Sequence, residues 1–405
     1  MIIVIADNFS GAAEIAGIGH AHGLSTSLLT DLGNGLPVCD LLVIATNTRS
    51  MTEPEAVATT HTICQQIKMG LPQLSDARRA ALTPLQRAQN TAYMNETLHI
   101  YKMTDPLLRG HVHLELRALV EESRYEQVMY LPANPSKGNS IRGGRYYVEG
   151  TPIDQTALKK DPDFPILTAN VADAIGVRPG SRLRICDAED MQDVRRTTKL
   201  ALMNRTPTLL AGSSDLFSAL LLELGHKMGR HKQFGGLSEK GVSLILCGSA
   251  LSIDISKKPY IQRHGMAVAP MPREVFDSIA SHSLSIQDAT DRWMGRLKQA
   301  QIVSSKAASF VLTMPYPSIG SSESALALRN VTAEMAKRLA SQSQLTELVI
   351  EGGDTAFTAL QKLGWTRFAV TQQITPSAIR MQCLDAPHTY LTFKPGGADW
   401  GDVFV

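Results

Sequence analysis

Short runs of apolar residues recur along the chain, and each run is followed by a polar loop and an alanine-rich stretch. The first run is Ile2–Ala6, after which residues 7–11 form a polar loop and residues 12–22 a helical stretch that ends at Gly23. Most of these runs are apolar throughout rather than alternating, which is typical of strands buried on both faces of a sheet. Strands that alternate with helices form crossover connections, so the pattern predicts an α/β fold.

The same pattern divides the chain into two halves. Further strands are predicted at residues 41–45, 100–102, 128–131, 182–186 and 209–211 in the first half, and at 242–247, 309–313, 348–351 and 368–371 in the second, with helices at 323–340 and 355–363. The polar, glycine-rich stretch 229–241 is the best linker candidate. We therefore predict two doubly wound, mostly parallel-sheet domains, at residues 1–235 and 240–405.

Composition narrows the functional classes. The chain has 405 residues, of which 43% are hydrophobic, and 40 Lys and Arg residues against 38 Asp and Glu residues give a net charge of +2. This balance argues against a nucleic-acid binder, which usually carries a basic excess. No apolar run is long enough to cross a membrane, and the apolar N-terminus lacks the basic region of a signal peptide.

Cysteine usage indicates the compartment. Five cysteines, an odd number, stand without any C-x-x-C spacing, which argues against disulfides and against a zinc site. We expect each of them to be a small buried apolar residue in a cytoplasmic protein.

Ligands of open α/β sheets bind beyond the carboxyl ends of the strands, so the loops that follow the predicted strands are the places to look for chemistry. In the loop at residues 7–11, backbone N–H groups and the start of the helix could bind an anion, and Asp7 could accept a proton. The alternative interpretation is that Asp7 or Ser10 only caps the helix.

A cluster of charges follows the third predicted strand. Lys102 and Arg109 could hold a carboxylate or phosphate, and Asp105 could be the general base for a sugar hydroxyl. The alternative is that these residues form ion pairs with one another in a solvated loop. His111 and His113 diverge too far to share a metal ion, and no metal site is predicted.

Three strands of the second half lead into glycines. Glycine lets a backbone approach a ligand closely, and the free N–H groups of a first helical turn can then bind a phosphate. No Walker A sequence is present. Three such loops in one domain nevertheless favour a nucleotide site, which would consist of Ser249, Gly352, Gly353, Asp354, Thr355 and Gly396.

Taken together, these motifs resemble the four-carbon acid sugar kinase family. The family's ADDxTGA, DTxSR, YKKxDSTLRGNxxxE and PAxPxxGR motifs correspond to residues 6–12, 45–49, 101–115 and 132–139, and its C-terminal GS, GGDT and KPGxFG motifs correspond to residues 248–249, 352–355 and 394–401. The correspondence runs in order from residue 2 to the C-terminus, which makes it more specific than any single motif.

The resemblance implies an N-terminal substrate domain, a C-terminal ATP-binding domain and an active site in the cleft between them. It implies an alcohol-group phosphotransferase that uses ATP and Mg²⁺ on a small sugar acid such as threonate or erythronate, with neither nucleic acid nor membrane as a partner. Whether the chain forms a homo-oligomer is left open. The resemblance assigns catalysis to Asp7 and Asp105 and substrate binding to Asn8, Arg49, Lys102 and Arg109.

The sequence departs from the family pattern in the first half of the chain, at Asn8, Ala45, Pro106 and Asn139. One interpretation is a changed substrate; the other is a weakened relative that binds nucleotide or sugar acid as a sensor. We favour the changed substrate because the charged residues of the expected site are retained. A dehydrogenase is disfavoured because no G-x-G-x-x-G follows a strand.

Overall fold

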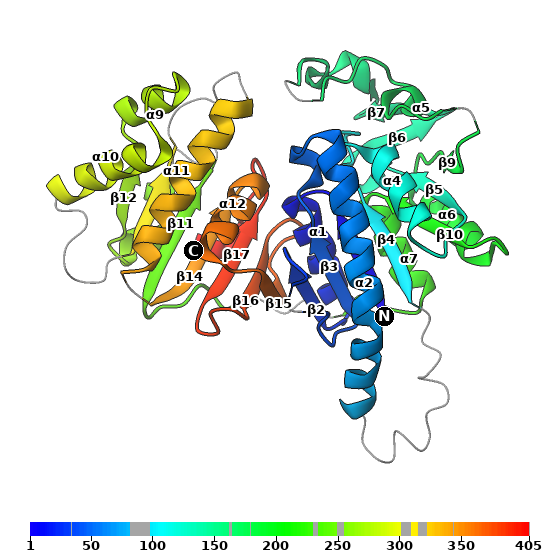
Figure 1. Cartoon of the computed structure of the whole chain (residues 1–405), viewed down its shortest axis with the longest axis horizontal. Coiled ribbons are helices and arrows are strands. Elements are labelled where there is room, and N and C mark those ends of the chain that lie inside the picture. The colour runs from blue at the N-terminus through cyan, green and yellow to red at the C-terminus, as the bar shows by residue number, and fades with distance from the viewer. Residues whose placement is uncertain are drawn as a thin grey trace. The chain divides into compact units, whose positions relative to one another are not determined.

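The chain forms two compact units, Met1–Gly229 and Arg230–Val405, called here the N-terminal and C-terminal units (Figure 1). The computed structural model describes residues 1–33, 35–81, 98–161, 164–178, 180–229, 234–248, 255–300, 309–314, 322–342 and 344–404. The division between the units falls inside the predicted linker 229–241. Each unit contains helices and a mostly parallel sheet, so the predicted α/β fold class is confirmed.

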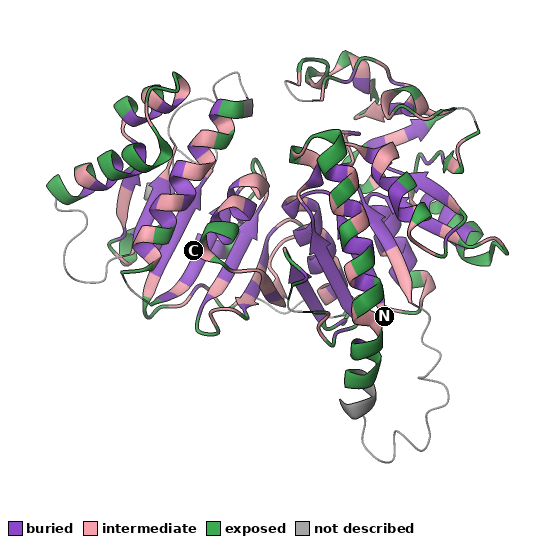
Figure 2. Cartoon of the chain, viewed as in Figure 1, coloured by how far each residue is buried: buried purple, intermediate pink, exposed green. Residues whose placement is uncertain are grey.

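The N-terminal unit contains a parallel sheet in the order β2-β3-β1-β4-β10-β5-β9. Its strands are β1 (Ile2–Ala6), β2 (Thr26–Leu29), β3 (Leu41–Ala45), β4 (His99–Met103), β5 (Gln127–Leu131), β9 (Leu183–Ile185) and β10 (Thr208–Gly212). Strands β1, β2 and β3 are buried along their whole length, and β5 and β10 are buried except at their first residue (Figure 2). For β1 and β3 this burial agrees with their uninterrupted apolar runs.

The helices of the N-terminal unit form two packed groups, as a doubly wound sheet requires. These helices are α1 (Phe9–Ala21), α2 (Glu53–Ala81), α4 (Val112–Glu121), α5 (Val171–Ala174), α6 (Met191–Met203) and α7 (Ser214–Glu223). Helix α2 packs on α4, whereas α1 packs on α7 and α7 packs on α6. A small antiparallel sheet of β6 (Asn139–Arg142), β7 (Arg145–Val148) and β8 (Thr151–Pro152) is inserted after β5.

The C-terminal unit contains a mixed sheet in the order β12-β13-β11-β14-β17-β16-β15. Its strands are β11 (Val242–Cys247), β12 (Ala267–Pro270), β13 (Phe310–Thr313), β14 (Leu345–Glu351), β15 (Arg367–Gln373), β16 (Ile379–Cys383) and β17 (Tyr390–Lys394), and its helices are α8 (Pro259–Arg263), α9 (Arg273–Ala280), α10 (Ile286–Gln299), α11 (Ser322–Ala340) and α12 (Gly353–Leu363). The pairs from β12 to β17 are parallel, but β16 pairs antiparallel with both β17 and β15.

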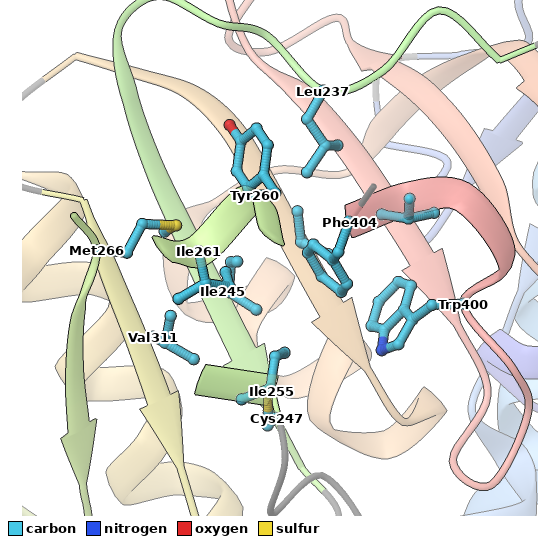
Figure 3. Close-up of a cluster of buried hydrophobic side chains, with 12 residues drawn as sticks. Leu237, Ile245, Cys247, Ile255, Tyr260, Ile261, Met266, Val311, Trp400 and Phe404 are labelled. Carbon is cyan, nitrogen blue, oxygen red and sulfur yellow. The ribbon is translucent and has the colours of Figure 1, made fainter. Parts of the chain in front are cut away.

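A buried apolar cluster joins the C-terminal end of the chain to the sheet of its unit (Figure 3). The last turn contributes Trp400 and Phe404, which pack with Ile245 of β11 and with Tyr260 and Ile261 of α8. Because β17 precedes this turn, the loop between them, residues 395–399, is held at both ends. The packing therefore fixes where the third predicted glycine loop begins and ends.

All five cysteines are buried and none forms a disulfide: Cys39, Cys64, Cys186, Cys247 and Cys383. Burial raises the pKa of the Cys64, Cys186 and Cys383 thiols to about 11. The prediction of small buried apolar residues is therefore confirmed. Among the described helices, none is both long enough and apolar enough to cross a bilayer.

Candidate functional site

Three neighbouring strands of the N-terminal unit end side by side. Ala6 at the end of β1 pairs in register with Ala45 of β3 and with Met103 of β4. The residues that follow these strands therefore share one edge of the sheet, where parallel α/β sheets place their ligands. The structure brings together there five of the predicted site residues, which are Asp7, Asn8, Arg49, Asp105 and Arg109.

Asp7 is the buried carboxylate of this edge, with a residue exposure of 1%. Its Oδ1 accepts a hydrogen bond from Asn8 Nδ2 at 2.6 Å, and its Oδ2 accepts one from the backbone N–H of Asp105 at 3.1 Å. Burial raises the pKa of Asp7 to about 6, opposed by the Lys102 charge and reinforced by the carboxylates of Glu115 and Asp105. A carboxylate with this pKa is suited to accept a proton near neutral pH.

Asn8 caps helix α1. Its Oδ1 accepts a hydrogen bond from the backbone N–H of Gly11 at 2.8 Å, while its Nδ2 donates to Asp7. The alternative that Asp7 or Ser10 caps this helix is therefore wrong, because the intervening asparagine does so. The substrate-binding role predicted for Asn8 stays a prediction, since both ends of its amide already have partners within the protein.

Asp105 fixes two arginines. Its Oδ2 accepts from Arg49 Nη1 at 2.7 Å and from Arg109 Nη2 at 2.8 Å, while its Oδ1 accepts from the backbone N–H of Leu107 at 2.8 Å. Arg109 Nη1 also lies 3.7 Å from Asp161 Oδ2. The arginine side chains are 17% and 29% exposed against 3% for the aspartate, so each arginine keeps some exposed surface above a buried carboxylate. The alternative of ion pairs among these residues is thus observed, and the substrate-binding role of Arg49 and Arg109 stays a prediction.

Lys102 lies beneath this site rather than at its surface. Its side chain is 0% exposed, and Lys102 Nζ lies 2.8 Å from Glu115 Oε2 on α4. Thr48 Oγ1, in the short helix Thr48–Ser50, donates to the same carboxylate oxygen at 2.8 Å. Lys102 therefore acts on Asp7 through its charge in this structure, and its predicted role in substrate binding stays a prediction.

The backbone around the site adopts left-handed conformations that side chains disfavour. Asn47 and Leu108 have φ values of 57° and 63°, and Gly110 has φ of 98°. A Cβ atom at Gly110 would lie 3.4 Å from Arg49 Cγ and 3.6 Å from Asp7 Oδ2. Both distances are ordinary van der Waals contacts, so the positive φ of Gly110, rather than a lack of space, is what favours glycine here.

Two buried polar residues of the site were absent from the predicted set, namely Thr48 and Glu115. Glu115 could have been found from Lys102, because a lysine within an apolar strand needs a buried countercharge. Thr48 stands at the serine position of the DTxSR motif, and that correspondence is the sequence signal that could have found it.

In the C-terminal unit, β11, β14 and β17 end beside one another, and each leads into a glycine. The backbone N–H of Gly248 donates to Glu351 O at 3.2 Å, and that of Gly352 donates to Lys394 O at 3.0 Å. Gly352 has φ of 97° and directly precedes α12, whose first residue is Gly353. The turn at residues 352–355 thus leaves the first N–H groups of α12 at the same strand ends.

Close packing explains the glycine in one of these loops but not in another. A Cβ atom at Gly248 would overlap Thr355 Oγ1, so packing explains that glycine. A Cβ atom at Gly396 would meet nothing within 4 Å, so packing does not explain this one. Asp354 accepts a hydrogen bond from Arg329 Nη1 at 3.4 Å. Ser249 lies outside the described residues.

Comparison with known proteins assigns a class to each unit. Residues 2–178 match the family of sugar-binding N-terminal domains, and residues 262–398 match the family of nucleotide-binding C-terminal domains. The chain is 24% identical to the 3-oxo-tetronate kinase of Haemophilus influenzae over 100% of this chain and 98% of the relative. It is 22% identical to the D-threonate kinase of Salmonella typhimurium over 55% of this chain and 54% of the relative.

Solved structures show the same fold. A crystal structure of a Salmonella typhimurium protein aligns with a TM-score of 0.70 at 19% identity, covering 100% of this chain and 97% of the other. One of a Haemophilus influenzae protein aligns with a TM-score of 0.63 at 20% identity, covering 99% and 98%. With a sugar-binding domain followed by a nucleotide-binding domain, and with kinases as its relatives, the chain belongs to the four-carbon acid sugar kinase family and is a phosphotransferase.

Proposed function

We propose that this chain is an ATP-dependent kinase that phosphorylates a hydroxyl group of a four-carbon or similar sugar acid, such as threonate, erythronate or a 3-oxo-tetronate. The observation that carries the proposal is Asp7, a buried carboxylate with a pKa of about 6 beside two arginines that Asp105 holds. The substrate class follows the names of the relatives, 3-oxo-tetronate kinase and D-threonate kinase.

The arginines would bind the negative charge of the substrate. A guanidinium group can grip a carboxylate or a phosphoryl group with two parallel hydrogen bonds, and Arg49 and Arg109 each retain exposed surface for this. In this proposal Asp105 orients the two guanidinium groups, and its own N–H orients Asp7. Asp105 therefore prepares the site, and the role of base belongs to Asp7.

The proton of the reacting hydroxyl would pass to Asp7. As that proton leaves, the hydroxyl oxygen forms a bond to the γ-phosphorus of ATP, the bond from that phosphorus to the bridging oxygen breaks, and ADP departs. Such transfer depends mainly on positioning and charge neutralisation, which a fixed carboxylate and two fixed cations can supply.

The glycine loops of the C-terminal unit would hold the nucleotide. The turn at residues 352–355 would present N–H groups to phosphate oxygens, and a Cβ atom at Gly396 would meet nothing within 4 Å, which leaves room for a ligand. Mg²⁺ usually binds one or two carboxylates together with the phosphates. The turn at residues 352–355 contains such a carboxylate, Asp354, in the first turn of α12. When bound, Mg²⁺ would neutralise charge on the phosphates.

The replacements at Asn8 and Ala45 fit a changed substrate. Alanine in place of the family's aspartate removes one carboxylate from the end of β3, and the asparagine keeps a hydrogen bond on Asp7. Neither change removes the proposed base or the arginines. The weakened, sensing relative remains the competing function.

The test measures ADP formation with a panel of C4 and related sugar acids. We expect turnover with at least one acid, and we expect Arg49→Ala and Arg109→Ala each to raise KM or lower kcat/KM about 10- to 100-fold, the value of one charge-assisted hydrogen bond. Arg117→Ala is the matched control, because Arg117 is exposed on α4 and pairs only weakly with Glu121. Retained activity in both arginine variants would refute the proposed role of Arg49 and Arg109 in binding the substrate. Ligand-induced thermal stabilisation without any ADP formation would favour the sensor.

A further inference from the structure

Two adjacent parallel strands of the C-terminal unit end in a buried pair of opposite charges that the predicted site did not include. Glu351 is the last residue of β14 and Lys394 the last residue of β17, and the two residues pair in register. Lys394 Nζ donates to Glu351 Oε1 at 2.8 Å, and both side chains are 3% exposed. Each residue directly precedes a loop that carries two glycines.

The ammonium group of Lys394 has several partners within the protein. Besides Glu351, Lys394 Nζ contacts Pro395 O at 3.3 Å and lies 4.9 Å from the centre of the Trp400 ring. An ammonium group has three N–H donors, and these contacts supply an anion, a carbonyl and an aromatic face. Lys394 therefore differs from a phosphate-binding lysine, whose charge must be free to meet the ligand.

The backbone at the same strand ends is tied together. The carbonyl of Lys394 accepts from the N–H of Gly352, and the carbonyl of Glu351 accepts from the N–H of Gly248. The charged pair thus stands at the point where the loops after β11, β14 and β17 are mutually connected. A change in its geometry would move the loops after β14 and β17 relative to each other.

We propose that Lys394, through its ion pair with Glu351, is a positioning residue that sets the spacing of the two glycine loops for the phosphates of a nucleotide. This inference rests on the proposed use of ATP, and it adds a residue that governs nucleotide affinity without touching the nucleotide. Because both side chains are buried, replacing either one removes a short ion pair from the base of both loops, where breaking such a pair is costly.

The experiment measures the dissociation constant of the intact protein for ATP by calorimetry, together with KM for ATP, KM for the sugar acid and the melting temperature. The variants are Lys394→Met, Glu351→Gln, the double variant and Lys394→Arg. We expect each of the first two to weaken ATP binding at least 10-fold while KM for the acid changes less than 2-fold. We expect the double variant to lose no more than the worse single variant, because both act through one pair. Lys394→Arg should restore part of the affinity.

Arg367→Met is the matched control. It breaks another ion pair of the same unit, between Arg367 Nε and Asp385 Oδ1 at 2.8 Å, away from the glycine loops. We expect it to lower the melting temperature without changing ATP affinity. If Lys394→Met fails to fold, Glu351→Gln, which keeps the shape of the side chain, decides the question.

Unchanged ATP affinity in folded Glu351→Gln would overturn the positioning role and leave the proposed kinase intact. Additive losses in the double variant would overturn it too. Failure of the wild-type protein to bind ATP would overturn both proposals.

Discussion

At the scale of single residues, the pKa of Asp7 is set by burial and neighbouring charges, which act in opposite directions. Burial raises its pKa, and the neighbouring carboxylates add to that effect, while the buried charge of Lys102 and the guanidinium of Arg49 act against it. The net result, a pKa of about 6, keeps Asp7 ionised at neutral pH and still able to take up a proton.

The pH dependence of turnover should reveal this balance. Since the proposed base works only when ionised, we expect kcat/KM to rise with pH through about 6 and then to level off. Asp7→Asn should lower kcat at least 100-fold and leave the melting temperature within a few degrees, because the amide oxygen keeps one of the two hydrogen bonds that Asp7 accepts and no buried charge remains. The exposed Asp31→Asn is the control. A profile that stays flat across this range, or an active Asp7→Asn, would exclude Asp7 as the base.

The sequence predicted which charged residues of the N-terminal site would be near one another, because the carboxyl ends of parallel strands share one edge. It did not predict which of them would be buried. Lys102 and Arg109 were equivalent as cations in the sequence, yet one pairs with Glu115 inside the protein and the other reaches solvent. The difference arises because Lys102 lies on β4, where Glu115 of α4 meets it, whereas Arg109 lies in the loop after β4.

At the scale of elements, the segment that enters the C-terminal unit is fixed by another buried ion pair. Glu347 of β14 pairs with Arg380 of β16, and its Oε1 accepts from the backbone N–H of Ser238 at 2.8 Å. Arg380 Nη1 donates to Gly236 O at 2.8 Å. The pair thus holds the stretch at residues 236–238, which lies next to the boundary between the units.

Glu347 should make the stability of this element depend on pH. Burial raises the pKa of Glu347 from 4.5 to about 7, although Arg380 and the N–H of Ser238 oppose the shift. The folded state therefore favours the protonated form, and the stability that this provides is complete below about pH 4.5 and is lost as pH rises through 7. Relative to the wild-type protein, Glu347→Gln should gain stability over that interval, by up to about 3 kcal/mol.

Urea unfolding of both proteins at a series of pH values measures the difference. Glu323→Gln is the control, because the side chain of Glu323 is 82% exposed. A difference in unfolding free energy that does not vary with pH would show that Glu347 keeps an ordinary pKa.

Elements were predictable where the local pattern was strong. The helices predicted at 323–340 and 355–363 correspond to α11 and α12, which begin and end within two residues of those bounds. Strand β16 and its antiparallel pairing were not predicted, because a short connection after β15 reverses the chain where the preceding pattern indicated crossovers. The short strands β2 and β12 were missed, since four residues carry little periodicity.

At the scale of the whole molecule, sugar-acid chemistry and nucleotide chemistry are expected in different units. The sequence indicated two domains from the repetition of strands and helices and from the glycine-rich stretch between them. The overall charge of +2 gave no sign of the arginines at one sheet edge, because a local cluster hardly changes a total. Strand order within each sheet depends on long-range pairing, so the sequence left it undetermined.

Hydrogen exchange of the intact chain can test the division of roles. We expect a non-hydrolysable ATP analogue to protect peptides that contain residues 350–355, and a sugar acid to protect those that contain residues 104–110. Saturation at about 100 times the dissociation constant would add about 2.7 kcal/mol to the stability of the unit that binds. The apo protein and a neutral sugar are the controls. Protection of residues 104–110 by the analogue alone would reverse the assignment of the units.

The burial of the cysteines has a consequence for studying the intact enzyme. Cys39, Cys64 and Cys186 belong to the N-terminal unit, and Cys247 and Cys383 to the C-terminal unit. Cys186 lines a pocket and is 8% exposed, so its modification does not require opening. A thiol reagent can reach the other four only in molecules whose surrounding structure has opened, so each of their modification rates reports the opening of one unit. Mass spectrometry of labelled peptides could then rank the two units in kinetic resistance to unfolding, in one sample, without introducing a probe or cutting the chain.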